Sequence, residues 1–345
     1  MKLLFERSKL HSQINYGELL TSSVKSYVLQ DQHVIVLTNQ RYYDRFFQKI
    51  EQSFPENKID CYICRNQLYC NNLDELKEVL IFLSQFPPSA KYLLLAFGNE
   101  GVVELTGFLQ KNILLDADYW VVAPSFSAMF TALSENKIIW QNPYHPVMLQ
   151  KNLPSQLFLD QTIVQKQNEG KLVDLQSFIQ IAVLTDGSLL RELYQVFPTK
   201  KNLTTASLTA FISPAVKSYE KNAVPIADFG KLFEKAFYLT ENGHLLSAYM
   251  KRFLAFLFQL FWNVVTFDLD FPLSAFMQWL KDLGYPLNLP SQFLIGDYLE
   301  QLASLQKEVS LSTLTKIGHL GKNHLADEKS LLRAMDYYQR IISEI

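Results

Sequence analysis

Apolar residues in the first half of the chain follow two spacings in turn. Short, nearly continuous apolar runs, typical of buried strands, are separated by segments in which apolar residues recur every three or four positions, typical of helices. The predicted strands are residues 33–39, 58–64, 91–97 and 119–124, and the predicted helices are residues 41–54 and 73–86. Buried strands that alternate with amphipathic helices predict a parallel sheet covered by helices on both faces.

The second half of the chain shows only the helical spacing. Its predicted helices are residues 171–184, 188–197, 207–221, 227–240, 245–265, 272–284, 296–307 and 329–345. A polar, turn-rich stretch between residues 150 and 170 separates the two patterns. We therefore predict an α/β domain of Rossmann-like type at residues 1–160 and an all-α domain at residues 161–345.

Charge and hydropathy exclude two classes of partner. The 345 residues carry 32 basic and 34 acidic side chains in mixed order, so we expect neither nucleic acid nor an anionic membrane as a partner. The most apolar stretch, residues 253–265, is shorter than a bilayer span and follows Lys251 and Arg252, which predicts a buried helix. The first residues lack the apolar core of a signal peptide, and we expect a cytoplasmic protein.

The three cysteines lie close together in sequence, at Cys61, Cys64 and Cys70. The first two have the spacing of a zinc or redox pair. However, no histidine lies near them, and the alternation in the stretch IDCYIC is typical of a strand. We therefore expect a strand here, with a metal or redox site as the alternative.

One stretch has the pattern of a cofactor loop. In LLLAFGNEGVVELTGFL, residues 93–109, an apolar strand leads through a glycine cluster into a helix. Dinucleotide pyrophosphates are usually held at such a place, and parallel sheets bind ligands at the carboxyl ends of their strands. Glu100 departs from the pattern, because it puts a carboxyl group where bare backbone is expected to face phosphate.

Several stretches, in one order along nearly the whole chain, resemble dehydroquinate synthase. They are the loop above, DADYWVVAPS, KNL at residue 151, LVDLQSFIQIAVLTD, EKNAVPIADFGKLFEKAF and LKDLGYPLNLP. The resemblance implies the family's fold, with an α/β nucleotide-binding-type domain followed by a helical domain for metal and substrate. Family members act in the shikimate pathway of aromatic amino acid biosynthesis. They use NAD and a divalent metal, usually zinc, to convert a seven-carbon sugar-acid phosphate into dehydroquinate.

The resemblance places poor ligands at the family's metal positions. Ser177, Lys231 and a residue between 245 and 248 fall where the family has a glutamate and two histidines. An ammonium group has no lone pair for a metal ion, so we expect no metal here. Lys231 in the former metal position, paired with Asp228, would support this loss. The alternative is a zinc site rebuilt from His145 or His244 with nearby carboxylates.

The resemblance also indicates a degenerate cofactor site. The family's glycine loop becomes Gly98, Asn99, Glu100 and Gly101, while Glu104 and Thr131 replace two of its aspartates. These changes add bulk and negative charge where a pyrophosphate would lie. We expect no NAD, with NAD and zinc binding as the alternative.

Few of the family's polar substrate contacts persist. Its cationic positions hold Leu115, Ala210, Val224 and Gln306. The family-equivalent residues that remain are Lys137, Lys151, Asn152 and Lys307. Because lysine is usually a solvated surface residue, these matches are as well explained by chance as by function.

The pattern of matches predicts a protein that has lost the family's reaction. Apolar scaffold positions agree with the family, whereas positions that touch metal, cofactor or substrate do not, which indicates a fold retained for another purpose. We predict a pseudoenzyme with a binding or regulatory role, as a homodimer, with a protein partner, or with a small ligand in the interdomain cleft. The aromatic pairs Tyr42, Tyr43, Phe46 and Phe47 are predicted to be exposed and available to an interface.

The alternative is an active enzyme with a rearranged site. It would be a 3-dehydroquinate synthase, a lyase that eliminates phosphate and closes a ring, or a related NAD- and metal-dependent sugar phosphate cyclase or polyol dehydrogenase.

Overall fold

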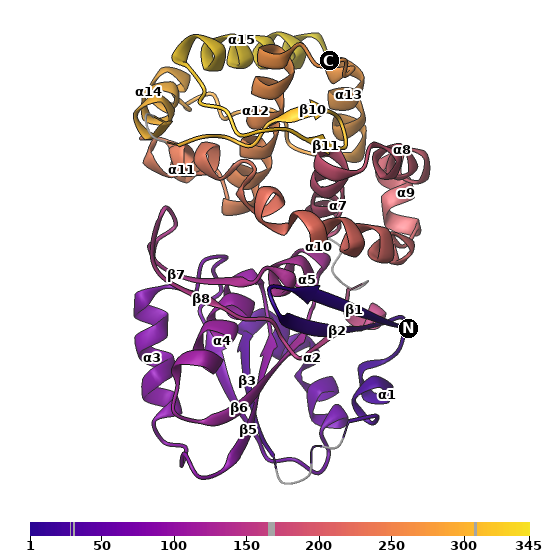
Figure 1. The fold of residues 1–345 in the computed structure, drawn as a ribbon, viewed down its shortest axis with the longest axis vertical. Coiled ribbons are helices and arrows are strands. Elements are labelled where there is room, and N and C mark those ends of the chain that lie inside the picture. The colour runs from indigo at the N-terminus through magenta and orange to yellow at the C-terminus, as the bar shows by residue number, and fades with distance from the viewer. Residues whose placement is uncertain (28, 30–31, 165–169, 307–308) are drawn as a thin grey trace. The chain divides into compact units, whose positions relative to one another are not determined.

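The computed structural model describes residues 1–27, 29, 32–164, 170–306 and 309–345 (Figure 1). The chain divides into two compact units, Met1–Gly170 and Lys171–Ile345. The first unit contains the predicted α/β pattern and the second the predicted helical pattern, so the predicted fold class is confirmed.

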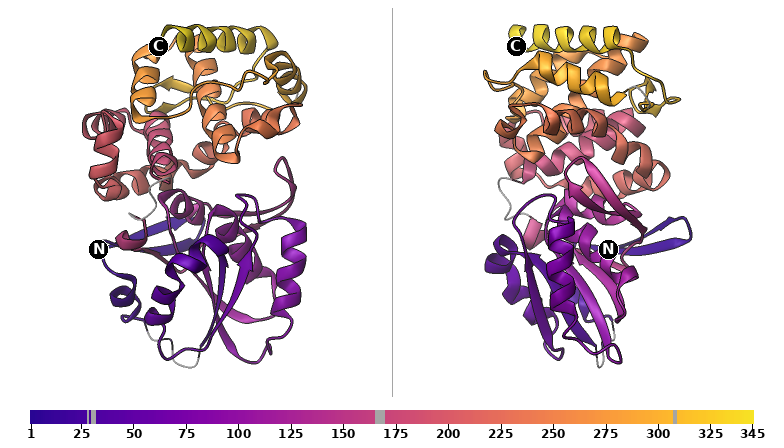
Figure 2. Two further views of the ribbon diagram at one scale, coloured as in Figure 1. Left: turned by 180° about the vertical axis from the view of Figure 1, so that it is seen from behind. Right: turned by 90° about the vertical axis from the view of Figure 1, so that its left-hand side faces the viewer.

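The first unit is built on a seven-stranded sheet in the order β1-β2-β9-β6-β5-β3-β4. All neighbouring strands are parallel except β1 and β2, which form an antiparallel hairpin that stands out from the sheet (Figure 2). The strands are β1 Lys2–Arg7, β2 Leu10–Tyr16, β3 His33–Asn39, β4 Ile59–Cys64, β5 Lys91–Phe97, β6 Asp116–Val122 and β9 Gln156–Leu159. The predicted parallel sheet is confirmed, and the β1–β2 hairpin is an addition to it.

The central strands are buried on both faces, as their continuous apolar runs predict. On one face, alternate residues of β3, β5 and β6 form a core with α1 Leu20–Val24, α2 Gln40–Ser53 and α6 Gln161–Val164. Residues between them point to the opposite face, where α4 Glu100–Asn112 packs on β3, β5 and β6. Helix α5 Phe126–Leu133 packs against α4 and β9.

The aromatic pairs of α2 were predicted to be exposed, and for two of the four residues this was wrong. Tyr42 and Phe46 are 8% and 3% exposed and lie in the core with Ile50, because positions 42, 46 and 50 share the face of the helix that meets the sheet. Tyr43 and Phe47 are half-buried and stack on each other, with ring centroids 4.5 Å apart.

A second hairpin stands apart from the main sheet. It consists of β7 Asn136–Asn142 and β8 His145–Lys151, and it contacts α3 Leu73–Leu83 and α4 (Figure 1). Most of β8 is exposed, whereas the first part of β7 alternates between half-buried and buried side chains. This hairpin was not predicted from the sequence.

The second unit is mainly helical, as predicted. Its elements are α7 Lys171–Thr185, α8 Gly187–Val196, α9 Lys200–Thr205, α10 Ile212–Asp228, α11 Lys231–Leu239, α12 Ala248–Phe267, α13 Leu273–Leu283, α14 Ile295–Gln306, α15 Glu328–Glu344, two short 3₁₀ turns at Leu208–Phe211 and Gly243–Leu245, and a small hairpin of β10 Leu314–Lys316 and β11 His319–Leu320.

Helix α12 is the most apolar helix and is buried along most of its length, as predicted. It packs against α7, α11 and α15. Three polar side chains of α12 are buried, Lys251, Gln259 and Asn263, and the last two bind backbone. Gln259 accepts from Gly230 N–H at 2.6 Å and donates to Ser312 C=O at 3.0 Å, and Asn263 accepts from Leu314 N–H at 2.8 Å. Within the described ranges, every helix is too short or too polar to cross a membrane.

Replacement of Gln259 by leucine tests whether its hydrogen bond with Gly230 N–H stabilises the folded protein. Gln259→Leu keeps the side-chain size but leaves the buried Gly230 N–H without its partner, which costs about 1–3 kcal/mol in the free energy of unfolding. Urea unfolding followed by circular dichroism measures the loss. The control is Gln278→Leu on the exposed side of α13, which should change the same quantity by less than about 0.5 kcal/mol. Equal losses in the two variants would contradict the assignment.

Candidate functional site

The order of the strands defines where a ligand crevice is expected. The chain runs from β3 to β4 on one side of β3 and then to β5 on its other side, so the connection changes direction between β3 and β5. Sheets of this kind bind ligands beyond the carboxyl ends of their strands at such a switch point. Strand β5 ends at Phe97, and therefore Gly98 to Gly101 lie at this edge.

Asn39, the last residue of β3, hydrogen-bonds to two neighbouring segments at this edge of the sheet. Its side chain is fully buried, and its Oδ1 accepts from Asn99 N–H while its Nδ2 donates to Arg65 C=O, both at 2.9 Å. Next to it, the Thr38 hydroxyl donates to Phe97 C=O at 2.5 Å. The carboxyl ends of β3 and β5 and the segment that follows β4 are thus hydrogen-bonded to one another.

Residues 65–70, here called the 65–70 segment, lie directly against the glycine loop. Asn99 Nδ2 donates to Gln67 C=O at 2.7 Å. A Cβ atom at Gly101 would lie 2.5 Å from Leu68 C=O and 2.9 Å from Cys70 N. A glycine is therefore required at position 101 because the protein's own backbone, rather than open space, lies beside it.

Glu100 is a buried, hydrogen-bonded residue. It is the first residue of α4 and only 5% exposed, and its carboxyl group accepts from the Ser127 hydroxyl in the first turn of α5. The neighbouring Asn99 side chain caps α4 by accepting from Val102 N–H at 3.2 Å. The Glu100 carboxyl group therefore lies near the N-terminal turns of two helices, where helix dipoles favour a negative group.

Lys137 departs from the usual surface position of lysine. It is fully buried, and its ammonium group donates to Thr131 C=O and Ala132 C=O at 3.0 Å and to Ser134 C=O at 2.5 Å. These carbonyls belong to the last turn of α5, which is a favourable place for a cation. Burial lowers the pKa of Lys137 to about 7, and the nearby Glu104 carboxylate acts in the opposite direction.

Glu104 and Asn152, two other predicted site residues, hold α4 to its surroundings. Glu104 Oε2 accepts from Asn71 Nδ2 at 2.6 Å, and the same amide donates to Ile138 C=O at 2.7 Å on β7. Asn152 is buried, and its Nδ2 donates to Gly107 C=O at 2.8 Å and to Gln110 Oε1 at 2.9 Å.

Lys151 belongs to an ion cluster around the buried Glu135 carboxylate. Its ammonium group lies 3.2 Å from Glu135 Oε1, and Arg7 Nε lies 3.6 Å from the same oxygen. Burial raises the pKa of Glu135, but hydrogen bonds from Ser8 and Lys151 and the charge of Arg7 outweigh it and lower the pKa overall. The remaining predicted residue, Lys307, lies outside the described residues.

At the positions matched to metal ligands, the second unit has short-range contacts. The Ser177 hydroxyl donates to Val173 C=O at 3.3 Å within α7. Lys231 pairs with Asp228 at 3.1 Å, and the two side chains are 46% and 56% exposed. In the ranges that the structure covers, no three histidine, cysteine, aspartate or glutamate residues gather as a metal site would need. His145 is exposed on β8, and His244 lies 3.3 Å from Glu241 C=O.

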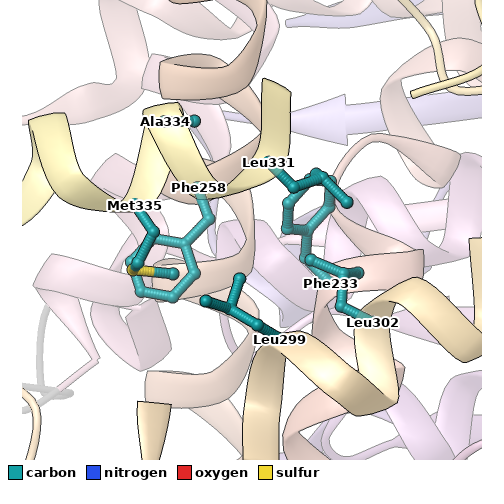
Figure 3. Close-up of a pocket in the computed structure, with 7 residues that line it drawn as sticks. All are labelled: Phe233, Phe258, Leu299, Leu302, Leu331, Ala334 and Met335. Atoms are coloured by element: carbon teal, nitrogen blue, oxygen red, sulfur yellow. The ribbon is translucent and has the colours of Figure 1, made fainter. Parts of the chain in front are cut away.

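A small cavity in the second unit has no polar chemistry. It measures about 10 Å³ and is enclosed by side chains of α11, α12, α14 and α15 (Figure 3). The lining residues are Phe233, Phe258, Leu299, Leu302, Leu331, Ala334 and Met335. A space of this size and composition is a packing void rather than a substrate site.

Solved structures share this fold over almost the whole chain. A 2-deoxy-scyllo-inosose synthase, solved with carbaglucose-6-phosphate, NAD+ and Co2+, superposes with a TM-score of 0.78 at 13% identity, over 98% of this chain and 99% of that chain. A 2-epi-5-epi-valiolone synthase from Streptomyces hygroscopicus subsp. jinggangensis 5008, solved with NAD+ and Zn2+, has a TM-score of 0.77 at 12% identity, over 97% and 98% of the two chains. The fold is therefore the dehydroquinate-synthase-like fold.

The sequence itself is homologous to 3-dehydroquinate synthase. The enzyme of Listeria monocytogenes serotype 4a is 23% identical over 324 residues, which cover 83% of this chain and 82% of the enzyme. No protein-family model matches the chain.

The buried ammonium of Lys137 predicts a pH dependence of stability. Because the pKa is lowered from 10.5 to about 7 on folding, the unfolded chain holds more protons between these values, and rising pH stabilises the folded protein. We expect the free energy of unfolding of the wild type to rise relative to that of Lys137→Met between pH 7 and pH 9. Urea unfolding at each pH measures it.

The control for this prediction is Lys111→Met, which removes an exposed lysine from the end of α4. The difference between this variant and the wild type should stay constant over the same pH range. A constant difference for Lys137→Met as well would show that the buried group does not titrate in this window.

Proposed function

We propose that this chain is a non-catalytic member of the dehydroquinate-synthase-like proteins, with a role in binding and regulation rather than in sugar phosphate chemistry. The observation that carries the proposal is the hydrogen-bonded closure of the switch point by Asn39, Asn99 and the 65–70 segment.

The switch point closed by Asn39, Asn99 and the 65–70 segment is a poor site for a dinucleotide. A pyrophosphate is bound by free backbone N–H groups at a helix N-terminus, next to glycines that leave room for it. Here Asn99 caps α4, the Glu100 carboxyl group lies at the same end, and Leu68 and Cys70 fill the space beside Gly101. A pyrophosphate at this helix N-terminus would meet the buried Glu100 carboxyl group and a loop that is held by the Asn39–Asn99 hydrogen bond. This supports the proposal that the chain binds no NAD.

The residues at the family's metal positions do not fit a zinc ion either. The Ser177 hydroxyl is bonded within its own helix, and the Lys231 ammonium group offers no lone pair and is paired with Asp228. Zinc sites require several nitrogen, sulfur or carboxylate donors that converge on one point. We therefore propose that the metal has been lost together with the cofactor.

Family-equivalent cations in the first unit are engaged in contacts within the protein. Lys137 caps the end of α5, and Lys151 pairs with Glu135. A phosphorylated sugar acid needs charge-assisted contacts to its phosphate and its carboxylate, each worth about 1.5–3 kcal/mol. The loss of such contacts supports the absence of the family's reaction.

Preservation of both cores supports a retained role other than catalysis. Apolar residues fill the sheet faces and the interior around α12, as in a protein under selection for its fold. We propose that the protein acts in the cytoplasm through a protein partner or as a homodimer.

Cofactor and metal binding by the purified protein test the proposal. After purification in the presence of zinc, we expect less than stoichiometric metal by elemental analysis, and we expect no saturable change in nicotinamide fluorescence when NADH is titrated to millimolar concentration. The 2-epi-5-epi-valiolone synthase, which has been solved with NAD+ and Zn2+, is the positive control. One zinc per chain together with micromolar affinity for NADH would overturn the proposal.

A single substitution distinguishes two reasons for an absence of NAD binding. The crevice is either closed by contacts of the loop or blocked by the Glu100 side chain alone. Glu100→Gly removes the carboxyl group but leaves the Asn39–Asn99 hydrogen bond and the 65–70 segment in place. We therefore expect no gain of NADH binding in the same titration, with circular dichroism to show that the variant is folded. Micromolar binding by Glu100→Gly would mean that the carboxyl group alone excludes the dinucleotide.

A further inference from the structure

The two cysteines that lie next to each other in the fold are not the two that are closest in the sequence. Cys61 and Cys64 lie three residues apart on β4, so their side chains point to opposite faces of the strand. The hydrogen-bonding neighbour of the Cys64 thiol is instead the thiol of Cys70, six residues further along. Cys64 and Cys70 are 2% and 0% exposed, whereas Cys61 is half-buried, and all three are free thiols.

Cys70 lies where the 65–70 segment touches the glycine loop. Its sulfur is 3.7 Å from Asn99 Oδ1, the oxygen that also caps α4, and only 2.8 Å from where a Cβ atom at Gly101 would lie. Cys64 ends β4, and the segment leaves the sheet immediately after it. The two thiols therefore stand at the two ends of the stretch of chain that covers the N-terminus of α4.

We propose that Cys64 and Cys70 are an oxidation site, at which an intramolecular disulfide forms and fixes the 65–70 segment over the N-terminus of α4. The oxidant is a small disulfide such as oxidised glutathione. One cysteine thiolate attacks a glutathione sulfur and releases one glutathione, and the second cysteine then displaces the other glutathione from the mixed disulfide. Two cysteine thiols and one oxidised glutathione give one protein disulfide and two reduced glutathiones.

The surroundings of the pair make this reaction slow in the closed structure. The hydrogen bond with Cys70, burial and the nearby Glu75 carboxylate all raise the pKa of Cys64 well above its usual value. The thiolate is the nucleophile, so a buried thiol with a raised pKa reacts slowly. The rate of oxidation is therefore set by how often the 65–70 segment opens, and the disulfide then holds the segment in place.

Cys61 is not expected to form a disulfide with Cys64 or Cys70. Burial and the neighbouring Asp60 carboxylate raise the pKa of Cys61 to about 12. Its side chain also points away from Cys64, because odd and even positions of a strand alternate between faces.

Peptide mapping tests the proposal on the full chain. The folded protein is incubated with oxidised glutathione, its remaining thiols are blocked with iodoacetamide in denaturant, and it is then digested with trypsin. Cleavage after Lys58, Arg65 and Lys77 separates residues 59–65, which contain Cys61 and Cys64, from residues 66–77, which contain Cys70. We expect these two peptides to be joined, with the blocking group on Cys61, and to separate after treatment with dithiothreitol.

The Cys61→Ser variant is the matched control, and it should give the same joined peptides at the wild-type rate. The proposal would be overturned by a disulfide within residues 59–65, by glutathione adducts that persist without the joined peptides, or by three blocked thiols after prolonged oxidation. None of these outcomes depends on whether the protein binds NAD or a metal, so this test is independent of the proposed function.

Discussion

The buried amide of Asn39 is the contact on which the rest of the candidate site depends. Its two hydrogen bonds join β3, the loop after β5 and the segment after β4, at the only change of direction in the parallel part of the described sheet. A buried amide that is hydrogen-bonded through both its nitrogen and its oxygen is costly to open, because each group left unsatisfied loses about 1–3 kcal/mol. With this contact in place, Gly98 and Gly101 permit close packing of the chain on itself.

The charged residues near this edge are also held by contacts within the protein. A carboxyl group, Glu100, lies at the start of α4, and an ammonium group, Lys137, lies at the end of α5, each where a helix terminus favours its charge. In an active dinucleotide enzyme such helix termini and charges are available to ligands. In this protein Glu100 accepts from the Ser127 hydroxyl and Lys137 donates to carbonyls at the end of α5. These internal contacts are the physical basis for proposing a folded protein without the family's chemistry.

Much of the scaffold could be predicted from the sequence, whereas the contacts of the site could not. Strands β3 to β6 and the long helices have strong apolar periodicity, and the position of the loop after β5 follows from them. The hairpin β7–β8 is half exposed and carries little pattern. Three contacts depend on segments that meet only in the fold. They are the burial of Lys137, the hydrogen bond between the Cys64 and Cys70 thiols, and the hydrogen bond from Asn39 to Arg65 C=O. The pair of Asp228 and Lys231 spans only three positions, so its formation could be considered from the sequence.

A crystal structure of the protein grown with NAD+ and zinc chloride would test the closed switch point most directly. We expect no dinucleotide density at the N-terminus of α4, with Asn39 Oδ1 still accepting from Asn99 N–H at about 2.9 Å. Pyrophosphate density beside Gly98 and Gly101, with the 65–70 segment displaced and the Asn39 hydrogen bond broken, would contradict it.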